Sequence, residues 1–219
     1  DHVINRNFSV CNSDTDYRKF IHNICKDEQD RIESMQSTIG FLMHGHKNLS
    51  FCPAVILNDE VISDNPEGGT GKGIFMNALS QMKKVVTIDG KSFTFERTLE
   101  KKNKDAIKIP FSKSPKIAIT TNYAIKGSGN SFARRKWELE LHQHYTKNFT
   151  PLTEFKKLFF GDWDDSEWCA FDNYMIECLM GYLRTGLVES KFVNLKIRQL
   201  SAETSHDFIE WCGLINGSQ

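Results

Sequence analysis

A glycine-rich stretch within residues 61–79 constrains the fold more than any other feature of the chain. A short apolar start leads through a polar turn into Gly68-Gly69-Thr70-Gly71-Lys72-Gly73, and an apolar run of helical character follows at residues 74–79. Strand, glycine turn and helix in this order let backbone N–H groups close around phosphate oxygens, because glycine has no Cβ to clash. The helix N-terminus adds partial positive charge. Lys72 is then placed to reach β- and γ-phosphates, so the stretch predicts a triphosphate site.

The stretch departs from the usual P-loop pattern at two positions. Pro66 stands where the first glycine is usual, and Gly73 stands where Ser or Thr normally ligates Mg²⁺. The alternative interpretation is therefore an ordinary glycine-rich turn between a strand and a helix. The strand–turn–helix context favours the phosphate site.

Composition narrows the class of protein without naming a ligand. The chain has 219 residues, of which 39% are hydrophobic and 26% charged, as is typical of soluble globular proteins. Lysine plus arginine equals aspartate plus glutamate at 28 each, so only local patches can indicate nucleic acid. No apolar run approaches the ~20 residues of a membrane span, and we expect no membrane partner. The six cysteines form no CxxC pair, which favours reduced thiols in a cytoplasmic protein over zinc ligands.

Hydrophobic periodicity predicts an α/β fold in three parts. A helical lead-in occupies 1–50, with helices over roughly 15–27 and 28–46. The P-loop core occupies 51–150, with a parallel-rich sheet, and 151–219 is mainly helical. Within the core we expect the apolar run at 51–57, with residues 61–62, to supply one or two strands before the glycine turn. A helix at 72–82 and further strands at 84–88, 116–122 and 137–141 are expected to follow. Asp59 and Glu60 are interpreted as a turn rather than a catalytic pair.

Residues 97–116 form the basic part of the chain. A β-hairpin is predicted here, with a basic tip that carries Lys101, Lys102 and Lys104. The alternative is a solvated charged loop. The position of this basic segment between the glycine turn and the next strand favours a role in binding over a solvated loop.

Two polar signals follow the basic segment. Asn122 ends the strand predicted at 116–122, where it is either a turn residue or a group that faces the γ-phosphate and orients the attacking water. Arg134 and Arg135 precede the next strand. They are either a surface pair or the source of a guanidinium that reaches a neighbouring subunit's γ-phosphate.

Taken together, the order of these motifs resembles the helicase domain of superfamily 3, of the phage or mobile-element primase-helicase (primase-polymerase) type, over about residues 15–215. The resemblance implies an AAA+-like fold that forms a hexameric ring on single-stranded DNA, uses ATP and Mg²⁺ in DNA replication, and works with a fused or associated primase in the bacterial host cytoplasm if phage-encoded. By this resemblance Lys72 and the 68–73 backbone bind phosphates, Asn122 is the sensor, Arg134 or Arg135 is the arginine finger, and the hairpin lysines contact DNA.

The resemblance also implies a strand ending in two acidic residues, between the P-loop and the sensor strand, that holds Mg²⁺. The only similar stretch is Val85–Asp89, and Asn122 follows Lys72 by just 50 positions. Either Asp89 takes an unusual role or a segment is absent near 92–99, and we prefer the second. A nucleotide-binding module without unwinding activity, such as a loader, a regulatory ATPase or a degenerate relative, remains the alternative function. A small-molecule kinase explains the sensor and arginines less well.

Overall fold

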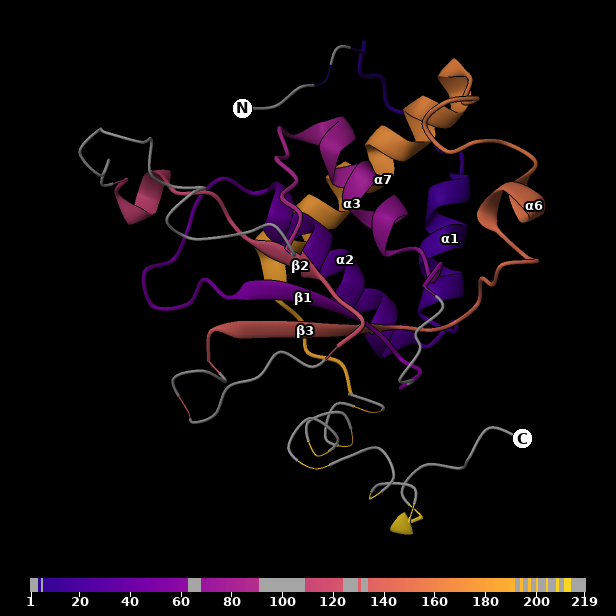
Figure 1. The fold of residues 1–219 in the computed structure, drawn as a ribbon. Coiled ribbons are helices and arrows are strands. Elements are labelled where there is room, and N and C mark those ends of the chain that lie inside the picture. The colour runs from indigo at the N-terminus through magenta and orange to yellow at the C-terminus, as the bar shows by residue number, and fades with distance from the viewer. Residues whose placement is uncertain are drawn as a thin grey trace, which may run out of the picture.

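The computed structural model describes residues 4, 6–62, 68–90, 109–123, 130, 134–191, 194, 197, 200, 204, 208 and 211–213. These residues form a mixed α/β structure (Figure 1). The elements, in chain order, are α1 (Asp16–Ile24), α2 (Gln29–Met43), β1 (Ala54–Asp59), α3 (Lys72–Met82), the 3₁₀ turn η1 (Phe111–Lys113), β2 (Ala118–Thr120), β3 (Lys136–Leu141), α6 (Pro151–Phe155) and α7 (Asp165–Thr185).

The described strands form one parallel sheet in the order β2-β1-β3. Val55 of β1 lies opposite Ala118 of β2, and Asp59 at the end of β1 lies opposite Leu141 of β3. Strand β1 is therefore central, and both later strands return to its sides through long connections, as parallel pairing requires. The expectation of an α/β fold with parallel strands is confirmed. All three strands point the same way, so their carboxyl ends meet at one edge of the sheet.

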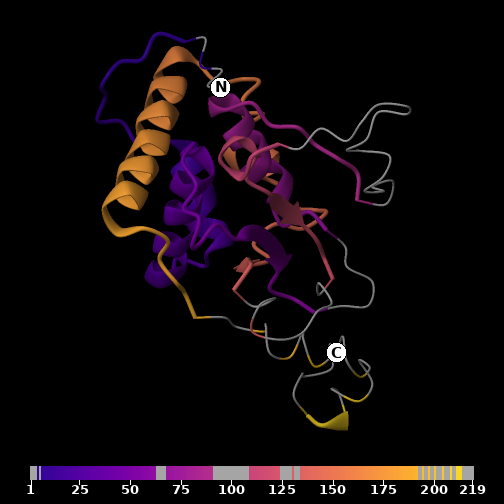
Figure 2. The ribbon, with the colours of Figure 1, turned by 90° about the vertical axis from the view of Figure 1, so that its left-hand side faces the viewer.

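One face of the sheet carries the hydrophobic core. Val55 and Leu57 of β1 are fully buried there, together with apolar side chains of β3 and of helices α1, α2, α3 and α7. Figure 2 shows α7 on the outside, with α1 and α2 between it and the strands. Helices from both ends of the chain therefore cover the same face of the sheet.

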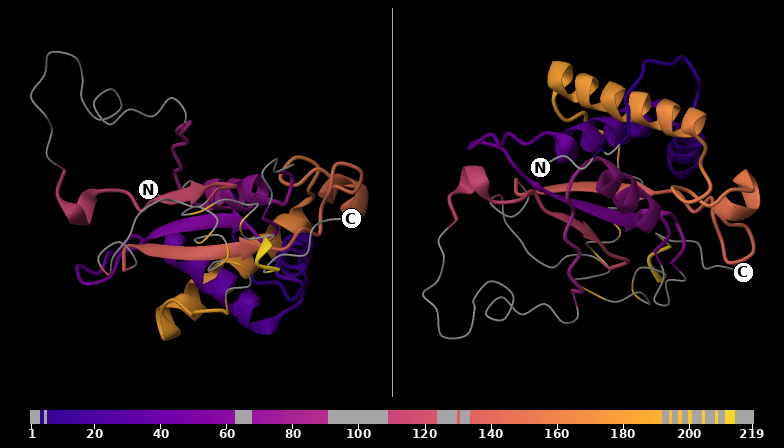
Figure 3. Two further views of the ribbon diagram at one scale, coloured as in Figure 1. Left: turned by 60° about the horizontal axis from the view of Figure 1, so that its bottom comes forward. Right: turned by 90° about the horizontal axis from the view of Figure 1, so that it is seen from above.

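Helices α2 and α7 approach each other closely at Gly40. A Cβ placed on Gly40 would lie 2.4 Å from the carbonyl oxygen of Cys178 and 2.5 Å from Cβ of Tyr182, both on α7. Figure 3 shows, in its right-hand view, α7 lying along α2 on the side away from the strands. The missing side chain at Gly40 is what allows this close approach of the two backbones.

Several local expectations are wrong. Residues 84–88 form no strand, and Val86 and Ile88 are exposed. Strand β2 is three residues long and partly exposed, with Ile119 37% accessible, whereas the sequence predicts a buried strand at 116–122. Strand β2 is the edge strand of this sheet, with β1 on its inner side, so β-branched composition alone does not create a longer strand. Within the part predicted to be mainly helical, α6 already ends at Phe155, because Lys156 adopts a left-handed conformation with φ 56°.

Candidate functional site

The glycine turn takes a backbone conformation that only glycine adopts at low cost. Gly68, Gly69 and Gly71 have φ values of 70°, 84° and 107°. Gly71 is the N-cap of α3, and a Cβ at this position would also lie 2.7 Å from the ring of Phe20 on α1. The turn is thus held against α1, and the backbone enters α3 directly at Lys72. The predicted helix at 72–82 is confirmed with the same bounds.

Lys72 bridges the ends of two neighbouring strands. Its Nζ lies 2.5 Å from Oδ1 of Asp59 and 2.5 Å from Oδ1 of Asn122. Asp59 is the last residue of β1, while Asn122 follows β2 after Thr121, whose N–H still donates to Leu57. Parallel α/β sheets bind ligands outside the carboxyl ends of their strands, which is where this ammonium lies. The sequence-predicted Lys72 and Asn122 are brought together here.

Asp59 is the residue of this site that sequence reasoning missed. The sequence pattern favours a turn at this position, but Asp59 lies in β1 and its side chain is only 8% exposed. The Thr70 hydroxyl, itself buried, donates to the same Oδ1 that accepts from Lys72. The available signal was a carboxylate two residues beyond the apolar run 51–57 and a short distance before the glycine turn.

The other predicted site residues lie elsewhere. Arg134 and Arg135 are exposed and precede β3, and the Arg135 carbonyl accepts from Ala54 at the start of β1. The length of β1, about 16 Å at ~3.3 Å per residue, separates that end of the sheet from Asp59. The two arginines are therefore not brought to Lys72 of their own chain. Lys101, Lys102 and Lys104, expected at the tip of a hairpin, lie outside the described residues.

The carboxylate pair expected for Mg²⁺ is not found in the described part of the chain. Asp89 is exposed and belongs to no strand, and Gly73, in the first turn of α3, has no hydroxyl to offer a metal. Within the described ranges, no three His, Cys, Asp or Glu side chains gather so that they could hold a metal ion. The carboxylate that forms an ion pair with Lys72 is instead that of Asp59.

The cysteines are all free thiols. Cys25 and Cys178 are buried, and burial raises the pKa of each thiol to about 12, so neither is a ready nucleophile. The other four are partly or fully exposed, so core thiols account for only two of the six.

Across the described residues, no helix combines the length and the apolar character needed to cross a bilayer.

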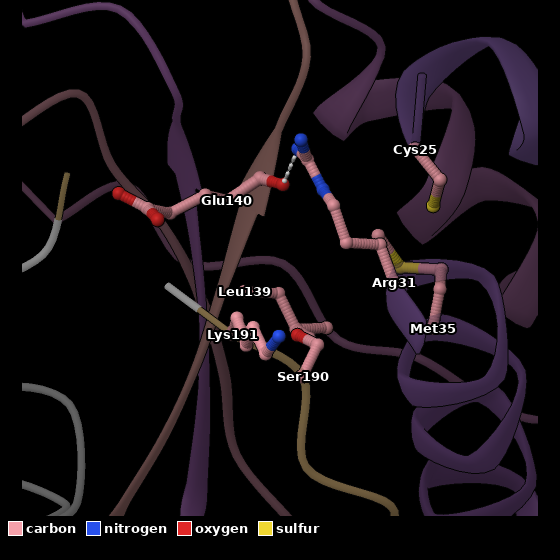
Figure 4. A pocket seen from close by; sticks show the side chains of 7 residues that line it. All are labelled: Cys25, Arg31, Met35, Leu139, Glu140, Ser190 and Lys191. Atoms are coloured by element: carbon pink, nitrogen blue, oxygen red, sulfur yellow. Dashed lines mark hydrogen bonds between the residues drawn. The ribbon is translucent and has the colours of Figure 1, made fainter. Parts of the chain in front are cut away.

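A small hollow lies between α2 and β3, and none of the seven side chains that line it belongs to the glycine turn (Figure 4). The buried Arg31 guanidinium extends along it and donates to the Glu140 carbonyl at 2.7 Å and to the Glu60 carboxylate at 2.9 Å. The Glu140 carboxylate points away from Arg31 and accepts from the Asn194 N–H. The Arg31 guanidinium in this hollow thus joins α2 to β3 and to the end of β1. We therefore interpret the hollow as part of the packing between these elements and not as a binding site.

Comparison with protein-family models and with curated proteins gives no match for this chain.

Proposed function

We propose that this chain binds a nucleoside triphosphate at the glycine turn and hydrolyses ATP. One observation carries the proposal: Lys72, at the N-terminus of α3, lies between Asp59 and Asn122 at the carboxyl ends of two neighbouring parallel strands. A lysine, the N–H groups of a helix start and a polar amide converge there. Each of these is a group that phosphate oxygens or an attacking water need.

Each group has a distinct task in this proposal. Backbone N–H groups of the turn and the first turn of α3 donate to phosphate oxygens, and the helix dipole favours their negative charge. Lys72 moves from Asn122 toward the β- and γ-phosphates. The Asn122 amide is then available to orient the water that attacks the γ-phosphate. Bound Mg²⁺ would neutralise the charge that develops on the phosphate oxygens.

We further propose that the ATPase drives movement on single-stranded DNA in a ring of identical subunits. Arg134 and Arg135 are solvent-exposed at the edge of the sheet opposite to Lys72. An arginine in that position can stabilise the phosphoryl transition state only at the site of a neighbouring chain. The basic residues Lys101, Lys102 and Lys104 supply charge for a sequence-independent contact with the DNA backbone.

A nucleotide-binding module that does not unwind DNA is the second candidate. Gly73 cannot ligate a metal through a side chain, and an acidic pair near Lys72 is not seen in the described residues. Both features would slow hydrolysis more than binding. This candidate function retains nucleotide binding but does not include movement along DNA.

The ATPase rate with and without single-stranded DNA separates the two candidates. A motor hydrolyses ATP faster on DNA, and Lys72→Ala removes the activity in both conditions while the far-UV circular dichroism is unchanged. Nucleotide binding with a low rate that DNA does not change supports the non-unwinding module. Full ATPase activity in folded Lys72→Ala protein contradicts the proposed site altogether.

A further inference from the structure

We propose that Asp59 makes nucleotide binding depend on Mg²⁺, by placing a carboxylate where the metal can join it to the phosphates. This inference rests on the proposed nucleotide site and assigns a metal ligand within it. The sequence pattern does not point to Asp59, since the usual ligand positions are the residue after the lysine and a separate acidic strand.

In the structure a side-chain ammonium group already lies between two oxygen atoms at this position. The Lys72 ammonium lies 2.5 Å from Oδ1 of Asp59 and 2.5 Å from Oδ1 of Asn122. The Asp59 carboxylate is nearly buried and also accepts from the Thr70 hydroxyl, which fixes its orientation. A carboxylate, an amide oxygen and a hydroxyl are the hard oxygen donors that Mg²⁺ prefers. The residues present therefore fit this metal.

Nucleotide binding changes the balance of charge around Asp59. Phosphate oxygens attracted to Lys72 draw its ammonium away from the Asp59 carboxylate and bring several negative charges close to it. A buried carboxylate whose ammonium partner has moved away is unfavourable, and so is its repulsion of the phosphates. Mg²⁺ removes both penalties, because it commonly binds through one or two carboxylates together with substrate phosphates. The Asp59 carboxylate should therefore weaken binding of the metal-free nucleotide and strengthen binding of its Mg²⁺ complex.

The test is equilibrium binding of a non-hydrolysable ATP analogue, measured with Mg²⁺ and with EDTA. Asp59→Asn keeps an acceptor for Thr70 and Lys72 but removes the charge. Wild type should lose affinity on metal removal by about tenfold to a hundredfold, as expected for one unit charge at intermediate dielectric. In Asp59→Asn the metal-free nucleotide should bind more tightly by a similar factor, so that the Mg²⁺ dependence nearly disappears.

Two further variants make the test specific. Asp89→Asn is the matched control, because Asp89 is the exposed carboxylate suggested by sequence, and it should behave as wild type. Asp59→Glu keeps the charge and should keep the Mg²⁺ dependence, which provides a second measurement if Asp59→Asn does not fold.

Two results overturn the inference. The first is a ratio of affinities with and without Mg²⁺ that stays at the wild-type value in folded Asp59→Asn. If both affinities are then also weaker than in wild type, Asp59 only orients Lys72. The second is loss of this ratio in Asp89→Asn, which would place the metal ligand at Asp89. If wild type binds no nucleotide in either condition, the proposed function itself fails, and that outcome is distinct from the other two.

Discussion

The close approach of α2 to α7 at Gly40 gives a quantitative test of the packing. Gly40→Ala places a methyl group 2.4 Å from the Cys178 carbonyl oxygen and 2.5 Å from the Tyr182 Cβ. Ordinary contact begins near 3.4 Å, so the two helices must separate by about 1 Å, and the buried atoms between them give up part of their dispersion energy. Overpacking of this kind costs about 1–3 kcal/mol. Alanine in a helix regains up to ~1 kcal/mol over glycine, which leaves a net destabilisation of up to about 2 kcal/mol.

Gly181→Ala on α7 is the matched control, because a Cβ there meets nothing within 4 Å. The same propensity gain, without a clash, should stabilise the protein by up to ~1 kcal/mol. Urea unfolding followed by circular dichroism gives both values, and the two variants should differ by about 1–3 kcal/mol in opposite directions from wild type. Equal stability of the two alanine variants would show that the backbones of α2 and α7 do not meet at Gly40.

Three further predictions concern DNA, subunit contacts and pH. Replacing Lys101, Lys102 and Lys104 of the predicted hairpin by Glu should weaken single-stranded DNA binding and reduce its salt slope by roughly 0.7 for each phosphate that is no longer neutralised. An unchanged slope would contradict a DNA-binding role for these three lysines. Mixing Lys72→Ala with Arg134→Ala subunits should restore ATPase activity that neither has alone, and no rescue would argue against an arginine acting between chains. Burial lowers the pKa of Lys116 from 10.5 to about 8, so between these pH values the unfolded chain binds more protons than the folded protein. The free energy of unfolding of wild type, relative to Lys116→Met, should therefore rise from pH 8 toward pH 10. A fall over this range would contradict the prediction.

Sequence reasoning succeeded where local chemistry decides the structure. The bounds of α3 follow from the glycine turn before it, and β3 follows from the alternation at residues 137–141, whose even and odd positions meet different environments. Lys72 and Asn122 were both expected near the γ-phosphate, Lys72 from the glycine turn and Asn122 from its place at a strand end, and the structure brings their side chains together. The start of α3 and the position of β3 thus follow from local sequence patterns.

Sequence reasoning failed where a partner elsewhere in the chain decides. The apolar run at 84–88 has the composition of a strand, but strand formation depends on a neighbour to pair with, and composition cannot supply one. Asp59 looks like a turn residue until the pairing of Asp59 with Leu141 extends β1 to include it. Its ion pair with Lys72 crosses the glycine turn, and no spacing rule in the sequence predicts that pairing.

Binding of the Mg²⁺ complex of a non-hydrolysable ATP analogue tests the central claim most directly. Lys72→Ala removes the ammonium between Asp59 and Asn122, while Lys84→Ala makes the same change of charge at an exposed lysine beyond the far end of α3. By isothermal titration, Lys72→Ala should lose at least about tenfold in affinity, the value of one charged hydrogen bond to phosphate, and Lys84→Ala should match wild type. Equal affinity of folded Lys72→Ala and wild type would contradict the assignment of this site to a nucleotide.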